Sequence, residues 1–316
     1  MLYIKSVKLN NFRCFKSKNI TLKPNINILI GDNGCGKTSV VEAISYLCLG
    51  KSFKSAKDKD VLNVEGDYFN IISEIFSENE ENKVVISYDG VNKRVKIGET
   101  LCKTLSEYVG KYKLISFSPD DLSIIKGGPS NRRRFIDLFI SQCDNRYLKL
   151  LVEYKRILKS RNEFLKNIKN QQYDKILFDV LTENIIKYGK LIIDVREKYI
   201  KVLNTYVKEI SSKLSNGKEI VEIEYIPNSN STLYESNMKK SMNYDVLTKI
   251  TNYGPQKDNL SVSLNGKEAN IYASQGQSRL AVLSMKIAIY EVFSKIDNNI
   301  IMILDDVFSE LDINRQ

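Results

Sequence analysis

A glycine-rich loop near the start of the chain carries the residues best suited to chemistry. The segment "GDNGCGKTS" begins at Gly31 and completes the pattern G-x-x-x-x-G-K-[ST]. Glycines at these positions let backbone N–H groups turn toward phosphates, and the start of the following helix favours anions. Lys37 is expected to reach the β- and γ-phosphates of a nucleotide, and the Thr38 hydroxyl to help hold Mg²⁺. The expected nucleotide-binding residues are Gly31, Asp32, Asn33, Gly34, Cys35, Gly36, Lys37, Thr38 and Ser39.

A pair of aspartates far downstream supplies the carboxylates that such a loop requires. The run "IIMIL" is a candidate buried strand, and Asp305 and Asp306 follow it directly. Asp305 is expected to contact Mg²⁺, directly or through water, and Asp306 to orient or deprotonate the attacking water. Lys37 and Asp306 are therefore the candidate catalytic residues. The alternative is a strand that merely ends in acidic residues facing solvent.

Kinases, GTPases and ATPases share the glycine-rich loop and the acidic strand end. A short polar segment at the start of a helix distinguishes between these classes. In "YASQGQSRLAVLSMKIAIYEV", Ser274, Gly276 and Gln277 open a long amphipathic helix, and its N-terminus is a second phosphate-binding device. One nucleotide does not need two such devices. We therefore expect Ser274 and Gly276 of one subunit to close over the γ-phosphate held by another. The alternative is an ordinary helix cap.

The composition limits the chemistry and the partners. The 316-residue chain has no histidine, which excludes histidine-based triads and removes the commonest metal ligand. Its five cysteines are scattered without a C-x-x-C pair, which argues against a zinc site and a disulfide framework. The net charge of +10 suits a nucleic-acid partner or a solvated, lysine-rich surface. Because no apolar run could cross a bilayer and no signal-peptide core is present, we expect a cytosolic protein.

Hydrophobic patterns predict the elements that position the glycine-rich loop. Short strands are expected over 3–30, including a buried strand "INILI" at 26–30, and a helix over 38–49. A hairpin turn is expected at Asp89-Gly90, because this dipeptide joins two runs of strand character. Another strand is expected over 111–119.

The second part of the chain has a different pattern. Apolar residues recur at helical spacing over 130–215, which predicts a helical insert. A strand is expected at 220–226 and a polar loop at 228–237. A hairpin turn at Asn265-Gly266 and a helix over about 277–296 complete the elements that precede the acidic strand.

Together these segments resemble ABC-type ATPases and, more narrowly, the RecF family of SMC-like DNA-repair ATPases. The resemblance covers most of the chain and is carried by "LNNFRCF", "GDNGCGKTSVVEAI", "GKSFKSAKDKDVL", "FSPDDLSIIKGGPSNRRRFIDLFISQ", "YGPQKDNLSVSLNGKEA", "SQGQSRLAVLSMKIA" and "LDDVFSELD". It implies an α/β fold with a discontinuous P-loop ABC-type ATPase lobe and a helical second lobe. The implied boundaries are 1–118 and 218–316 for the ATPase lobe, and 119–217 for the helical lobe.

The same resemblance implies a function and further site residues. It implies a homodimer that assembles head to head on ATP, hydrolyses ATP slowly and binds DNA at gaps and single-strand/double-strand junctions. The implied partners are the RecR and RecO mediators, which load RecA on single-stranded DNA. The implied site residues are Arg13 near the nucleotide, the trans signature of Ser274, Gly276 and Gln277, and a dimer-seam loop at 309–312.

Three departures from the family pattern affect these expectations. Gln256 stands where family members usually have a histidine, so any role of that histidine is absent or is taken by Gln256. No glutamine can be assigned to the Q-loop, and Asp120 or Asp121 is expected to substitute for it. A fold of this class is expected to continue beyond Gln316, so we expect the sequence to be incomplete there.

Basic residues at the entry to the helical insert and along its first long helix are the candidates for DNA contacts. They are Arg132, Arg133, Arg134, Lys155, Arg156, Lys159 and Arg161. A solvated helix face is the alternative interpretation. Two other functions remain open: a kinase built on the same loop, which would leave "SQGQ" unexplained, and a nucleotide-gated scaffold that scarcely hydrolyses ATP.

Overall fold

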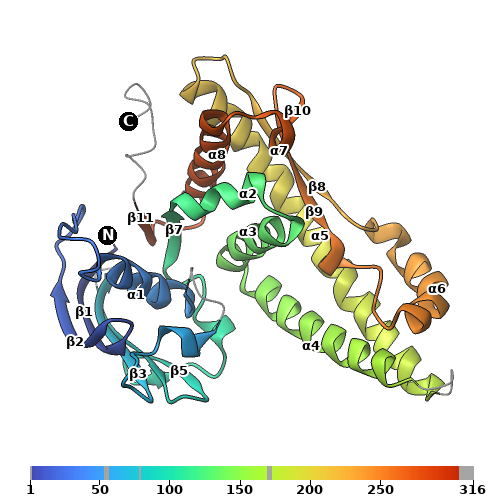
Figure 1. Cartoon of the computed structure of the whole chain (residues 1–316), viewed down its shortest axis with the longest axis horizontal. Coiled ribbons are helices and arrows are strands. Elements are labelled where there is room, and N and C mark those ends of the chain that lie inside the picture. Colours follow the sequence, from blue (N-terminus) through green and yellow to red (C-terminus); the bar gives the residue numbers. More distant parts are fainter. Residues whose placement is uncertain (1, 53–56, 78–79, 169–172, 306–316) are drawn as a thin grey trace. The chain divides into compact units, whose positions relative to one another are not determined.

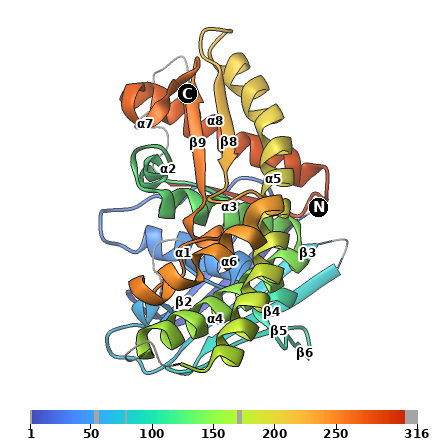
Figure 2. The same cartoon turned by 90° about the vertical axis from the view of Figure 1, so that its right-hand side faces the viewer.

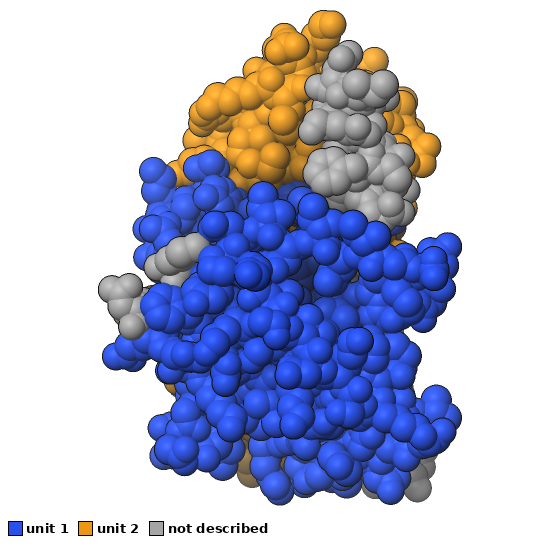
Figure 3. Space-filling view, turned by 90° about the vertical axis from the view of Figure 1, so that its left-hand side faces the viewer, with its two compact units in different colours: residues 1–119, 290–310 blue, residues 120–289, 311–316 orange. Residues whose placement is uncertain are grey.

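The chain forms two compact units, and the computed structural model describes residues 2–52, 57–77, 80–168 and 173–305. Unit 1 contains residues 1–119 and 290–310, and unit 2 contains residues 120–289 and 311–316 (Figure 3). These units divide the chain differently from the predicted lobes, because residues 218–289 group with the helices. The predicted lobe boundaries stay a prediction.

Unit 1 is built on a six-stranded antiparallel sheet with the strand order β2-β1-β3-β4-β5-β6. Its strands are β1 (Tyr3–Phe12), β2 (Phe15–Thr21), β3 (Phe69–Ser77), β4 (Glu80–Tyr88), β5 (Lys93–Ile97) and β6 (Thr100–Leu101). Figure 1 labels β1, β2, β3 and β5 of this sheet. Every second residue of β3 is buried, so Phe69, Ile71 and Ile75 lie on one face of the sheet. Helix α1 (Lys37–Leu49) packs against β1 and β3. Phe12, Tyr46 and Phe69 meet there edge to face, with ring centroids 5.4–6.0 Å apart.

A separate parallel pair of strands completes the described part of unit 1. β7 (Lys113–Phe117) and β11 (Ile300–Leu304) run in register from Lys113 opposite Ile300 to Phe117 opposite Leu304. The Lys113 ammonium is buried and forms an ion pair with Asp297, which precedes β11. The predicted strands at 111–119 and before Asp305 are therefore confirmed as strands. The expected burial of the second strand is wrong, because Met302 and Leu304 of β11 are exposed and only Ile303 is buried.

The predicted strand at 26–30 is wrong. Residues 22–30 form no strand, and the residues Ile26, Ile28 and Ile30 are exposed at 83%, 77% and 89%. An apolar run becomes a strand only where a neighbouring strand offers ladder hydrogen bonds. Among the described strands, none pairs with this segment. The glycine-rich loop therefore follows an unpaired segment.

Unit 2 is dominated by helices and confirms the predicted helical insert. They are α3 (Pro129–Cys143), α4 (Asn145–Asn167), α5 (Lys175–Leu214) and α6 (Ser231–Thr248). Helix α5 has 40 residues and is about 60 Å long at roughly 1.5 Å per residue. It packs against α4, α6 and the strand β8 (Val221–Ile226), as Figures 1 and 2 show. Asp144 and Asp174 cap the starts of α4 and α5, because their carboxylates accept backbone N–H groups of the first turn.

A small antiparallel sheet lies beside α5. Its order is β10 (Lys267–Glu268), β9 (Asn259–Leu264) and β8. Figure 2 shows β8 and β9 beside α5. Asn265 and Gly266 both have positive φ, which confirms the predicted hairpin turn there. The Asp89-Gly90 turn between β4 and β5 is also confirmed.

The predicted polar loop at 228–237 is wrong, because most of it is helix α6. The Asn230 side chain accepts the Leu233 N–H at 3.0 Å and so caps this helix. The polar residues that indicate a loop in the sequence instead form the start of this helix.

Three further helices of unit 2 bear on the site. They are α2 (Ser123–Lys126), α7 (Ala269–Tyr272) and α8 (Gln275–Ser294), the last of which continues into unit 1. Helix α8 confirms the helix predicted over about 277–296. Within the described ranges, no helix combines the length and the apolar character needed to span a bilayer.

Candidate nucleotide-binding loop and signature helix

The glycine-rich loop forms an anion-binding arrangement at the start of α1. Helix α1 begins at Lys37, and no side chain caps its N-terminus, so the backbone N–H groups of its first turn are directed toward the loop. The Lys37 ammonium donates to the carbonyls of Gly31 at 2.6 Å and Asp32 at 2.9 Å. The lysine therefore lies across the loop, where the phosphates of a nucleotide would be held.

Two glycines make this loop conformation possible. Gly34 and Gly36 have φ of 84° and 96°, in the left-handed region that side chains disfavour. A Cβ on Gly36 would also lie 2.5 Å from the Phe15 ring and 2.8 Å from the Cys14 Sγ. A residue other than glycine at position 36 would displace the turn between β1 and β2, which packs on the loop.

Arg13 in this turn is anchored to α1. Its guanidinium binds both carboxylate oxygens of Glu42 at 2.6 and 2.7 Å and donates to the Asp60 carbonyl at 2.6 Å. The hydrogen bond to Glu42 raises the pKa of Arg13 above its ordinary value. Glu42 is buried and also accepts the Ser52 hydroxyl. A nucleotide contact by Arg13, which stays a prediction, would compete with this bridge.

Mg²⁺ fits the oxygen donors that unit 1 offers. Asp305 follows β11, and its N–H donates to the Phe117 carbonyl of β7 at 2.9 Å, which fixes the backbone that carries the carboxylate. Thr38 offers a hydroxyl from the first turn of α1. Mg²⁺ is usually bound through one or two carboxylates with substrate phosphates and waters, so these donors suit it. Asp306 and the dimer-seam loop at 309–312 lie outside the described residues.

The signature forms a reciprocal capping box at the start of α8. The Gln277 N–H donates to the Ser274 hydroxyl at 3.2 Å, and the Ser274 N–H donates to the Gln277 side-chain oxygen at 3.0 Å. This is the helix cap that we considered as the alternative interpretation. A phosphate bound at this helix start would compete with the Ser274 hydroxyl for the same N–H. The predicted role in trans stays a prediction.

Asp121, one of the two candidates to substitute for the Q-loop glutamine, forms an ion pair within unit 2, and its predicted role stays a prediction. Its carboxylate accepts the Lys286 ammonium of α8 at 2.8 Å, and both side chains are largely buried, with exposures of 18% and 10%. The bond ties the 3₁₀ turn Pro119–Leu122 to the signature helix within unit 2. Sequence reasoning missed this ion pair, because no local pattern relates the two positions.

The basic candidates for DNA contacts divide into buried and exposed residues. Arg132 is buried and donates to Asn259 and Gly127, so the structure contradicts a DNA contact for it. Arg133 is half-buried and donates to the Asp258 carbonyl. The exposed candidates are Arg134, Lys155, Arg156 and Lys159. The last three form ion pairs with Asp137, Glu153 and Glu163, which a DNA phosphate would have to replace.

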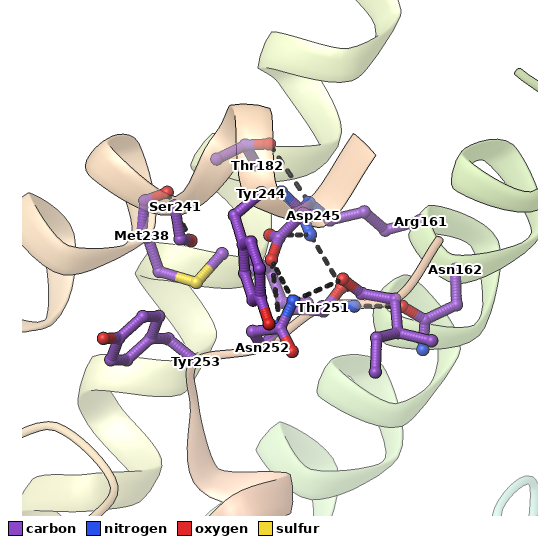
Figure 4. Close-up of polar contacts among 12 residues, drawn as sticks. Arg161, Asn162, Thr182, Met238, Ser241, Tyr244, Asp245, Thr251, Asn252 and Tyr253 are labelled. Carbon is purple, nitrogen blue, oxygen red and sulfur yellow. Dashed lines mark hydrogen bonds and ion pairs between the residues drawn. The ribbon is translucent and has the colours of Figure 1, made fainter. Parts of the chain in front are cut away.

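Arg161 is also contradicted as a DNA contact, because its side chain is 0% exposed. Figure 4 shows its polar contacts. Arg161 donates to Asp245 at 2.9 Å, Thr251 at 2.7 Å and Thr182 at 3.1 Å, and it stacks over the Phe178 ring at 4.8 Å. Burial lowers the pKa of Arg161 from its ordinary value. This arginine holds α4, α5, α6 and the following loop together.

Gln256 has a structural position in unit 2. Its side-chain oxygen accepts the Tyr154 hydroxyl, and its amide donates to the carbonyls of Thr251 at 3.2 Å and Tyr253 at 2.9 Å. Burial raises the pKa of Tyr154 far above its ordinary value, so this phenol remains a donor. Gln256 therefore joins α4 to the loop after α6. Its side-chain oxygen accepts one hydrogen bond from α4, and its amide group donates two to the loop.

Comparisons with known proteins agree with these features. An AAA domain family model matches residues 6–217. Proteins described as "DNA replication and repair protein RecF" from Lachnoclostridium phytofermentans and Clostridium perfringens are each 37% identical to the chain. They align over 320 and 327 residues, and each alignment covers 100% of this chain and 88% of the relative.

Solved structures give the same result. A structure of the recombination mediator protein RecF with ATP, in the RecFOR pathway, has a TM-score of 0.92 and 30% identity, covering 99% of this chain and 87% of that one. The corresponding structure with ATPrS has a TM-score of 0.92 and 31% identity, covering 99% and 88%. The Smc head domain of Pyrococcus furiosus has a TM-score of 0.53 and 18% identity, covering 100% and 84%, which shows a likeness of fold alone. The α/β ATPase fold and the predicted resemblance are confirmed, and the chain belongs to the RecF family of DNA replication and repair proteins.

Proposed function

We propose that this protein is a weak, DNA-stimulated ATPase of recombinational DNA repair in the cytoplasm. It dimerises on ATP, binds DNA at gaps or junctions, hydrolyses ATP slowly and supports RecA loading through RecR and RecO. The observation that carries the proposal is the phosphate loop, with the uncapped start of α1 and Lys37 lying across it. The relatives solved with ATP and ATPrS support the choice of nucleotide.

In this proposal, the residues of this chain have separate roles in binding and hydrolysing ATP. The loop amides and Lys37 bind the β- and γ-phosphates, and Thr38 and Asp305 hold Mg²⁺, which neutralises charge on the phosphates. Asp306 orients the attacking water or accepts its proton. Ser274 and Gly276 of a second copy complete the site around the γ-phosphate. Hydrolysis then resets a DNA clamp and modifies no other substrate.

The solution mass of the protein tests this proposal. We expect the mass measured by light scattering to double with Mg-ATP and to remain that of a monomer with Mg-ADP. Ser274→Arg places a bulky cation at the signature and should abolish the doubling, while nucleotide binding by the monomer is retained. A monomer in both nucleotide states would contradict the shared-nucleotide dimer.

Two other measurements test the alternative functions. Phosphoryl transfer to an acceptor other than water would favour a kinase. Full DNA-repair function of Asp306→Asn would favour a scaffold.

Alkylation of Cys35 is expected to block ATP binding, and bound ATP is expected to protect this thiol. Cys35 is exposed, and its Sγ lies 2.9 Å from the position that a Cβ on Gly31 would occupy, so an adduct would fill the loop. Labelling by N-ethylmaleimide can be followed by peptide mass spectrometry with and without Mg-ATP. The measurement uses a Cys14→Ser background, because Cys14 is also exposed and contacts Ser39. Equal labelling rates in both conditions would contradict the prediction.

A further inference from the structure

A lysine from α2 binds the backbone immediately before the signature. The Lys126 ammonium donates to the carbonyls of Ala273 at 2.8 Å, Asn270 at 3.2 Å and Ala269 at 3.4 Å. A lysine ammonium has three N–H donors and no acceptor, so these carbonyls match its full donor capacity. The carbonyls belong to α7 and to the residue after it, and Ser274 follows directly.

Helix α7 needs such a partner, because it has four residues and so makes a single turn. One turn of helix is unstable in isolation, since few hydrogen bonds offset the ordering of the backbone. Its carbonyls point toward its C-terminal end, where a cation is favourable. Lys126 therefore fixes the end of α7 from which the chain passes to Ser274.

The segment that carries Lys126 holds the signature on both sides. Asp121, in the turn before α2, pairs with Lys286 in α8, so it binds the helix that follows Ser274. Lys126 binds the turn that precedes Ser274. Both contacts lie within unit 2. The capping box of Ser274 and Gln277 is therefore held between two anchors on one short stretch of chain.

We propose that Lys126 is a positioning residue for the signature. By binding the α7 carbonyls it fixes the backbone of residues 274–277 in the orientation that a second subunit's γ-phosphate requires. The donors of Lys126 are engaged by these carbonyls, so in this proposal it acts through Ser274 and Gly276. This inference rests on the proposed function, because the signature matters for ATP only if it closes over a nucleotide.

The Lys126→Met variant tests the inference, because it keeps most of the length of the side chain and removes its donors. We expect it to weaken Mg-ATP-dependent dimerisation by about tenfold, in line with the loss of hydrogen bonds from a charged group. ATP affinity of the monomer should stay within about twofold of the unchanged protein, since the phosphate loop is untouched. Lys126→Arg should restore most of the dimerisation. Lys149→Met is the matched control, because Lys149 is an exposed lysine of α4 in the same unit.

A second measurement reports on the signature without any nucleotide. Amide hydrogen exchange in the monomer should become faster at residues 269–278 in Lys126→Met and should be unchanged in Lys149→Met and along α4. Unchanged exchange at 269–278 would overturn the positioning role, whatever the dimerisation result.

The two proposals fail in different ways. If Ser274→Arg leaves Mg-ATP-dependent dimerisation intact, the proposed function fails, and the inference for Lys126 fails with it. If Ser274→Arg abolishes dimerisation and Lys126→Met does not weaken it, the inference alone is overturned. Weakened dimerisation, faster exchange at 269–278 and rescue by arginine together support the inference.

Discussion

Lys37→Met is expected to lower ATP affinity by at least about a hundredfold, because hydrogen bonds from a charged group contribute about 1.5–3 kcal/mol each. Lys37 already lies across the loop, on the carbonyls of Gly31 and Asp32, so the ammonium is held where the β- and γ-phosphates would bind. Methionine keeps most of the length of the side chain and removes the charge. Equilibrium titration with a fluorescent ATP analogue measures the effect.

Two variants make the Lys37 result specific. Lys8→Met removes an exposed lysine from β1 of the same unit and should leave the dissociation constant unchanged. Lys37→Arg keeps the charge but replaces a compact ammonium with a planar guanidinium, and we expect it to recover little of the affinity. An affinity of Lys37→Met within threefold of the unchanged protein would show that the loop does not hold the nucleotide as proposed.

Asp245→Ala is expected to lower the free energy of unfolding of unit 2 by about 3–5 kcal/mol, because it leaves a buried arginine without its counterion. Arg161 and Asp245 are both 0% exposed in this unit, so the ion pair lies in the interior. One guanidinium nitrogen of Arg161, Nη2, already lacks a hydrogen-bond partner in the described part of the chain. Asp245 also accepts two hydrogen bonds from Asn252, so the loop after α6 would loosen as well. Urea denaturation followed by circular dichroism measures the change, since the helices lie mainly in unit 2.

A matched pair on the same helix provides the control for Asp245. Glu235 and Lys239 form an exposed ion pair on α6, so Glu235→Ala should leave the unfolding transition unchanged. The double variant Arg161→Met with Asp245→Leu should recover most of the lost stability, because apolar side chains can replace a buried ion pair. If Asp245→Ala unfolds at the same urea concentration as Glu235→Ala, the network in Figure 4 does not stabilise the unit.

The phosphate loop could be predicted because its chemistry is local. Its backbone geometry depends on glycines at fixed spacing within one short segment, and Gly34 and Gly36 adopt the left-handed conformation that requires them. The helices of unit 2 were predictable for a similar reason, since apolar residues at helical spacing mark a buried face.

The two buried arginines differ from the exposed candidates in their position on the helix, which charge alone does not show. Arg161 is four residues from both Ile157 and Leu165, which are buried, so it lies on the apolar stripe of α4. Arg132 likewise precedes the buried pair Phe135 and Ile136 by three and four residues. The helical spacing would have separated these two arginines from the exposed Lys155, Arg156 and Lys159.

Other features depend on partners distant in the sequence. The run at 26–30 has the composition of a buried strand, but composition does not show whether a neighbouring strand pairs with it. The bonds of Asp121 with Lys286, and of Lys126 with the α7 carbonyls, join segments far apart in the chain. The Arg13–Glu42 bridge likewise connects a turn to a helix. Such contacts leave no local pattern from which they could be predicted.

The parallel pair of β7 and β11 determines when unit 1 can be completed during translation. Lys113 at the start of β7 binds Asp297, 184 residues later, and β11 with Asp305 follows that aspartate. A ribosome that adds about 5–20 residues per second needs roughly 10–40 s to make the intervening chain. Throughout that interval β7 lacks its partner strand, while the sequence of unit 2 is being made. The phosphate loop is therefore synthesised well before Asp305, its candidate metal ligand. The nascent chain thus passes through a stage in which the nucleotide site is incomplete.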